Sequence, residues 1–192
     1  MSNTLNIPES LQFYFENEQQ ASAIQQVIES KSISIGLTWK EVEQYNIAKV
    51  SALTTQLDYW LLMKELWDVT WGKALASSVY KEVDSEDYEK TYSAESVWDD
   101  CFYKTYTFKE NVICFKCYAD DEGVYLGFFV ESPNEQYDIS NNMGLSDQWE
   151  KPEDDERSTQ KGIIDIKGKT EIDVEPLTNL ANEVVTKLNE QV

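Results

Sequence analysis

Histidine is absent from all 192 residues of the sequence, and this excludes several kinds of catalytic site. Ser-His-Asp triads, Cys-His dyads, histidine-ligated zinc and imidazole pH switches all need it. Arginine is nearly absent as well, because Arg157 stands alone beside fifteen lysines. Paired guanidinium bonds to phosphate are therefore not expected. Direct binding of nucleic acid is not predicted either, since the chain has no basic footprint.

Phosphate loops and targeting segments also lack support in the sequence. No GxxxxGK[ST] or GxGxxG motif occurs. Residues 1–8 have neither the basic nor the apolar region of a secretory signal, and no apolar run approaches a membrane span. The odd set Cys101, Cys114 and Cys117 is typical of reduced thiols rather than of a disulfide framework. We therefore expect a cytoplasmic protein without a membrane segment.

Apolar side chains are plentiful enough for a folded core. Hydrophobic residues make up 41% of the chain and aromatic residues 12%. Such a composition is not that of a disordered segment. A chain of this length is typical of one domain, and no internal repeat is visible. We predict a single α+β domain over residues 1–192.

The first half of the chain has helical spacing. Asn6 and Pro8 are typical of a helix start, and the helical pattern continues to about residue 30. Residues 32–37 alternate like a short strand, and Thr38 with Glu41 matches a capping box. Apolar residues then recur at steps of three and four, namely Ile47, Val50, Leu53, Leu57, Trp60, Leu61, Trp67 and Trp71. The pattern predicts two or three helices between residues 38 and 83. It is apolar nearly all round between Tyr59 and Val69, which indicates burial on more than one side.

The second half is rich in strand formers. Three aromatic and β-branched runs with short polar separators predict an antiparallel meander over about residues 97–131. Residues 132–161 are polar and predict a mobile acidic loop, and residues 162–167 predict one more strand. A C-terminal amphipathic helix is indicated by Leu177, Leu180, Ala181, Val184, Val185 and Leu188.

Acidic residues dominate the charge. The chain has 36 acids and 16 bases, a net charge of −20, whereas a small domain usually carries a magnitude of about 2–8. Duplex DNA carries roughly 24 charges over the width of a globule of this size, so the two totals are similar. The candidate partner-binding residues are the acid clusters Asp84, Glu86, Asp87, Glu89, Asp99, Asp100, Asp120, Asp121, Glu122, Glu153, Asp154, Asp155 and Glu156.

These features favour an acidic, non-enzymatic binding protein that inhibits or regulates a protein with a basic, nucleic-acid-binding surface. The most specific version of this hypothesis is a DNA or RNA mimic, such as an anti-restriction or anti-CRISPR inhibitor that a mobile genetic element encodes. The alternative is an immunity protein that neutralises a basic toxin. No cofactor is predicted, and the acid run at residues 120–123 lacks the spacing of an EF-hand.

Three other patterns give weaker support for a chemical or binding function. Cys114 and Cys117 form a CxxC, but positions three apart on a strand face opposite sides, so packed thiols are expected. Residues 152–155 followed by Asp165 and Lys167 superficially resemble the PD-(D/E)xK nuclease pattern, which would imply a magnesium-dependent phosphodiesterase. The aromatic residues Trp98, Tyr106, Phe115 and Phe128 are expected in the core or on a protein-binding face.

Overall fold

The structure is a computed structural model and describes eleven segments of the chain. These are residues 4–16, 18–19, 21–22, 38–76, 81–82, 101–108, 111–119, 123–131, 143–150, 158–164 and 166–190. The described residues form an α+β fold, which confirms the predicted fold class. The strand expected at residues 32–37 and the helical pattern after residue 22 lie outside them.

Four helices have defined bounds. They are α1 (Glu9–Glu16), α3 (Trp39–Val69), α4 (Trp71–Leu75) and α6 (Glu175–Glu190). Two of them, α3 and α4, fall in the region where two or three helices are predicted. The helix α3 begins directly after Thr38, whose carbonyl accepts a hydrogen bond from the Val42 N–H at 3.0 Å. All six residues that predict the C-terminal helix are buried in α6, so that prediction is confirmed.

A five-stranded antiparallel sheet follows the chain order. Its strands are β2 (Lys81–Glu82), β3 (Phe102–Phe108), β4 (Asn111–Ala119), β5 (Val124–Glu131) and β6 (Ser158–Ile164). The predicted meander is therefore confirmed as β3, β4 and β5. In β4 the residues Ile113, Phe115 and Cys117 are buried while those between them are half-buried, because successive side chains point to opposite faces.

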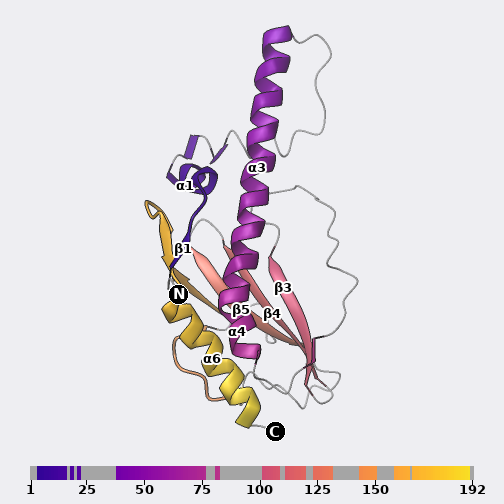
Figure 1. Cartoon of the computed structure of the whole chain (residues 1–192), viewed down its shortest axis with the longest axis vertical. Helices are drawn as coiled ribbons and strands as arrows, with labels where there is room; N and C mark the ends of the chain where they lie inside the picture. Colours follow the sequence, from indigo (N-terminus) through magenta and orange to yellow (C-terminus); the bar gives the residue numbers. More distant parts are fainter. Residues whose placement is uncertain are drawn as a thin grey trace.

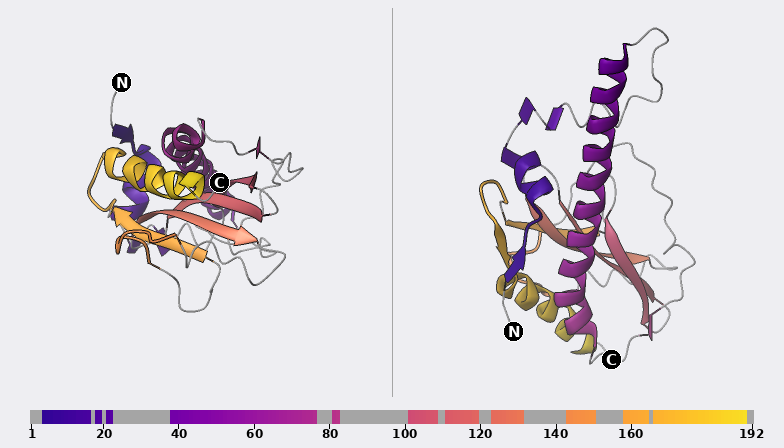
Figure 2. Two further views of the ribbon diagram at one scale, coloured as in Figure 1. Left: turned by 90° about the horizontal axis from the view of Figure 1, so that it is seen from below. Right: turned by 45° about the horizontal axis from the view of Figure 1, so that its top comes forward.

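The helices cover one face of this sheet. In Figure 1, α3 and α6 lie on the same side of the strands, and the left view of Figure 2 shows them next to each other above the sheet. The core between these layers contains Trp67 and Trp71 together with Tyr106, Phe115 and Phe128. The expectation of a core position is confirmed for the last three residues, whereas Trp98 lies outside the described residues.

A second, two-stranded sheet joins the two ends of the described chain. It pairs β1 (Thr4–Asn6) with β7 (Glu171–Asp173) in antiparallel register. Asn6 pairs with Glu171, so the prediction that Asn6 caps the first helix is wrong. The helix α1 begins three residues later, and the Pro8 carbonyl accepts hydrogen bonds from the N–H groups of Leu11 and Gln12.

The predicted strand near residue 162 is shifted toward the N-terminus. It runs from Ser158 to Ile164 as β6, which places its start inside the predicted acidic loop. The strand ends before Lys167, which lies exposed in a turn beside Gly168 at φ 69°. A positive φ suits glycine, because a Cβ atom strains that conformation. The prediction that Lys167 and Asp165 share a strand face is wrong, and Asp165 is outside the described residues.

The helix α3 dominates the shape of the molecule. Its 31 residues correspond to a length of about 46 Å. Figure 1 shows its N-terminal turns extending beyond the strands of the sheet. Within the described part of the chain, no helix combines the length and apolar character that crossing a membrane would need.

Candidate protein-interaction surface

The acid clusters predicted to bind a partner all lie outside the described residues. This holds for each of the thirteen candidates from Asp84 to Glu156. The described segments contain 17 of the 36 acids together with 11 lysines. Most of the net negative charge therefore belongs to the segments between the described elements, and the role of those acids stays a prediction.

Connectivity nevertheless links several clusters to one edge of the sheet. Asp99 and Asp100 directly precede Cys101 at the start of β3, and Asp120 directly follows Ala119 at the end of β4. These two strand ends are neighbours, since Phe102 pairs with Cys117. We call this edge the Ala119 edge. Two predicted clusters thus leave the sheet side by side at the Ala119 edge.

The other two clusters join the sheet elsewhere. The cluster at residues 84–89 follows Glu82 of β2, which pairs with Tyr106 in the middle of β3. The cluster at residues 153–156 precedes β6, whose first residue, Ser158, pairs with Phe129 toward the far end of β5. The predicted acids are therefore not all joined to one edge.

The helices α3 and α4 are fixed to β4 by the polar ends of three aromatic side chains, Tyr59 and Trp67 of α3 and Trp71 of α4. The Tyr59 hydroxyl accepts a hydrogen bond from the Ala119 N–H at 2.9 Å. The indole N–H groups of Trp67 and Trp71 donate to the carbonyls of Phe115 and Lys116 at 2.8 and 3.1 Å. Buried tyrosine and tryptophan need such partners, so these bonds fix the position of the helices along the strand.

The Ala119 edge consequently lies beneath the middle of α3. Tyr59 contacts its last strand residue, and the ring of Trp60 meets the ring of Phe102 edge-on at 5.7 Å. Beyond this level the N-terminal half of α3 extends away from the strands (Figure 1). The helix also contacts α1, where the Ser10 hydroxyl donates to the Asp58 carboxylate at 2.5 Å.

The outward face of α3 is apolar and uncovered. Six large side chains on it are exposed, and we call them the outward stripe: Trp39, Ile47, Val50, Leu53, Leu57 and Leu61. Trp39 is 89% exposed and Val50 64%, and even Leu61, level with the sheet, is 46% exposed. At 3.6 residues per turn, all six positions fall within about 120° of the helix circumference. The helix α3 therefore has an exposed apolar surface in addition to its buried face.

Charged residues border this stripe on its two sides. Asp58 and Glu65 lie on one side and Lys49 lies on the other, whereas Lys64 lies within the stripe, in line with Leu57 and Leu61. Lys64 forms an ion pair with Asp68 at 3.0 Å, with both side chains nearly half exposed. Such a pair at four-residue spacing contributes only about 0.3–0.5 kcal/mol, so it leaves both side chains open to other charges.

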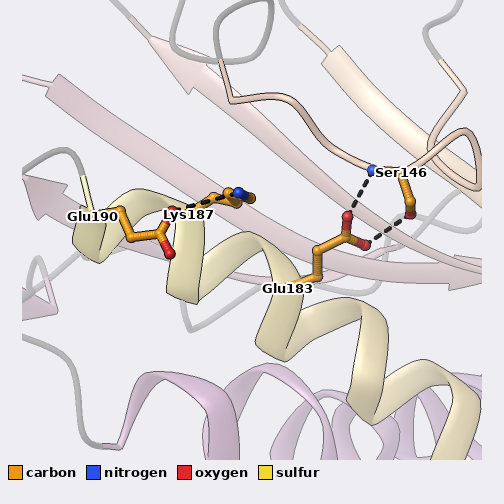
Figure 3. Close-up of polar contacts among 4 residues, drawn as sticks. All are labelled: Ser146, Glu183, Lys187 and Glu190. Carbon is orange, nitrogen blue, oxygen red and sulfur yellow. Dashed lines mark hydrogen bonds and ion pairs between the residues drawn. The ribbon is translucent and has the colours of Figure 1, made fainter.

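Glu183 on α6 binds the segment of residues 143–150 to the fold (Figure 3). Its carboxylate accepts hydrogen bonds from the Ser146 N–H at 2.6 Å, the Ser146 hydroxyl at 2.9 Å and the Trp149 indole at 3.3 Å. Met143 and Trp149 are buried against the core. The mobility of residues 132–161 stays a prediction, but the expectation that they have few apolar anchors is wrong for this segment.

The three thiols are separated by the sheet, as the strand pattern predicts. Cys117 faces the core and is fully buried, whereas Cys101 and Cys114 are half-buried. Burial raises the pKa of the Cys117 thiol well above its usual range, although a hydrogen bond with Thr70 opposes this. A buried protonated thiol is a poor nucleophile, so the CxxC has the arrangement of packed cysteines.

The described residues contain no group of three or more His, Cys, Asp or Glu side chains arranged to hold a metal ion. Lys167, the one described member of the nuclease-like pattern, is exposed in its turn. The other members of that pattern, residues 152–155 and Asp165, lie outside the described residues, so the phosphodiesterase hypothesis stays a prediction.

Sequence analysis missed the outward stripe because it contains the same residues that predict the helix. The steps from Ile47 to Leu61 predict the helix, but its buried face is a second series offset around it: Ala52, Thr55, Gln56, Tyr59, Leu62, Met63, Leu66 and Trp67. The presence of two apolar series on one helix is the signal that could have revealed a second contact surface.

Comparison of the chain with protein-family models, curated proteins and solved structures finds no match. Its function therefore has to be argued from its own residues.

Proposed function

We propose that the protein is an acidic, non-enzymatic binding protein that inhibits or regulates a partner with a basic surface. The net charge of −20 supports this, because self-repulsion of that size destabilises the compact state unless the charge has another use. Complementary charge speeds association and rejects partners of the wrong sign.

The observation that supports the proposal is that two acid clusters are joined in sequence to neighbouring strand ends at the Ala119 edge. Asp99 and Asp100 precede β3, and Asp120, Asp121 and Glu122 follow β4. All five lie within three residues of these strand ends in the sequence. A partner surface that holds DNA or RNA has the matching charge, so we propose nucleic-acid-binding proteins as the partner class.

The test uses a charge-neutralised variant of this edge and a matched control. The edge variant carries Asp99→Asn, Asp100→Asn, Asp120→Asn, Asp121→Asn and Glu122→Gln. The control neutralises the acids at residues 153–156 and Asp147, which removes the same number of charges away from the edge. Each protein is immobilised, exposed to lysate of the organism that encodes it, and eluted with a salt gradient before mass identification.

We expect basic proteins to be captured by the unchanged protein and by the control, and to be lost with the edge variant. Their association should slow strongly between low and physiological salt, since exposed charges are screened over about 8–10 Å. Capture that survives the edge variant, or that is independent of salt, would overturn the proposal. The identity of the captured protein separates a nucleic-acid-binding target from a toxin.

A further inference from the structure

We propose that the outward stripe of α3 is the contact surface of a homodimer, in which α3 of one copy pairs with α3 of a second copy. This inference is independent of the acidic surface and of its partner. It concerns the helix face opposite the core, where six large apolar side chains are exposed in a chain of strongly negative charge.

The spacing of the stripe is that of a helix-pairing seam. Ile47, Val50, Leu57 and Leu61 follow one another at steps of three, seven and four residues. The position skipped between Val50 and Leu57 is Thr54, which is exposed on the same face. Together they occupy the alternating three- and four-residue positions of two heptads, which is the pattern that paired helices bury. The pattern continues to Lys64, where it becomes charged.

The area of the stripe is sufficient for a weak dimer. The exposed fractions correspond to roughly 700 Å² of surface in each copy, which is above the 300–600 Å² that the largest apolar patch of a typical monomer exposes. Two copies would bury about 1,300 Å², near the lower limit of standard interfaces. Because the fold already fixes α3 as a helix, pairing does not have to order it. We therefore expect a dissociation constant of about 1–100 µM.

The charges on α3 permit two acidic copies to meet here. The helix carries five acids and three lysines, so it is close to neutral although the whole chain carries −20. Its two borders have opposite signs, since Lys49 lies on one side of the stripe and Asp58 and Glu65 lie on the other.

This charge pattern also favours a second copy over a basic helix from another protein. A basic helix would meet Lys49 along one border and Lys64 at the end of the stripe, which costs affinity. In a parallel pair of α3 helices, the lysine border of each copy faces the acidic border of the other. An antiparallel pair would instead set like borders together, so the parallel orientation is the complementary one.

Sedimentation equilibrium of the full chain from about 5 to 500 µM tests the proposal. The unchanged protein should show a monomer–dimer equilibrium. Val50→Gln with Leu57→Gln should weaken dimerisation at least about 100-fold without changing net charge, because four buried apolar side chains are lost from each dimer. The control, Gln44→Ala with Ser51→Ala, changes exposed α3 residues outside the stripe and should leave the dimer intact.

A second variant strengthens the surface rather than weakening it. Thr54→Leu should tighten the dimer about tenfold or more, because it places an apolar side chain at the one polar position of the seam. A protein that stays monomeric at 500 µM, with and without Thr54→Leu, overturns the proposal. A dimer that resists the two glutamines overturns it too, since the contact then lies elsewhere. If capture of a basic partner fails, the dimer result is unaffected, and the reverse also holds.

Discussion

The two faces of α3 are both apolar, yet only one of them enters the core. The inward face contains Tyr59 and Trp67, whose polar ends bond to the backbone of β4. The outward face has the aliphatic residues Val50, Leu57 and Leu61 and, at its first turn, Trp39. Hydrophobicity alone therefore does not determine which face of a helix is buried. The inward face differs in that the polar ends of Tyr59 and Trp67 find hydrogen-bond partners on the strand.

The largest expected difference comes from making the same substitution, leucine to alanine, on the two faces of α3. Leu66 is fully buried and Leu61 is 46% exposed, five residues apart on one helix. Leu66→Ala should lower the free energy of unfolding by about 2–5 kcal/mol, because it removes buried methyl groups and leaves a cavity. Leu61→Ala should change it by less than about 0.5 kcal/mol. Urea unfolding of the two variants measures the difference, and similar losses would mean that the outward face is also covered.

Removal of one hydroxyl tests the polar anchors. Tyr59→Phe leaves the ring in place but takes away the acceptor of the Ala119 N–H, which is buried at the end of β4. A loss of about 1–3 kcal/mol is expected, because a buried donor is left without its partner. Amide hydrogen exchange at Ala119 should accelerate with it. Unchanged stability and unchanged exchange would show that packing alone holds α3 on the sheet.

Glu183 tests whether a charged side chain holds a segment to the fold as the polar aromatic side chains hold α3. Glu183→Ala removes the acceptor of three hydrogen bonds from the segment of residues 143–150. We expect a loss of about 1–2 kcal/mol and a change in Trp149 fluorescence as the segment loosens. Glu190→Ala on the same helix is the control, since Glu190 forms an exposed ion pair with Lys187 at 3.4 Å (Figure 3). Equal effects of the two variants would contradict a special role for Glu183.

The smallest effect concerns the thiol on the inward side of β4. Burial raises the pKa of Cys117, so the folded state retains a proton that the unfolded state loses above about pH 8.5. The stabilising contribution of the Cys117 thiol to the free energy of unfolding is present below that pH. It is lost as the pH rises toward the pKa of the folded state. Between pH 7 and 9.5 the unchanged protein should lose about 1 kcal/mol more stability than Cys117→Ala does. Cys114→Ala should keep the full pH dependence, and a Cys117→Ala variant with the same dependence would refute the assignment.

The sequence predicts the local elements well because their signals are local. Alternation in β4 and the six apolar positions of α6 are readable from neighbouring residues. It fails where a contact joins distant segments. The pairing of Leu5 with Ile172 and the bonds from Ser146 to Glu183 leave no periodic trace in the chain.

For the outward stripe, the sequence identifies the apolar residues of the helix but not which of them face the sheet. The steps from Ile47 to Leu61 predict a helix correctly, but two overlapping apolar series give no local clue to which one faces the sheet. The sheet that decides this is encoded after residue 100. The acid clusters lie outside the described residues, and the strand register adds only that two of them join neighbouring strand ends at the Ala119 edge.

The order of elements has a consequence for synthesis of the chain. The helix α3 leaves the ribosome before any strand from β3 to β6, so its inward face has nothing to cover it at first. From the end of α4 to the end of β6 translation takes about 4–18 s at 5–20 residues per second. During that interval a nascent helix with two bare apolar faces is a binding site for holding chaperones. The pairing of β1 with β7 waits until residue 173 has emerged, and α6 emerges later still.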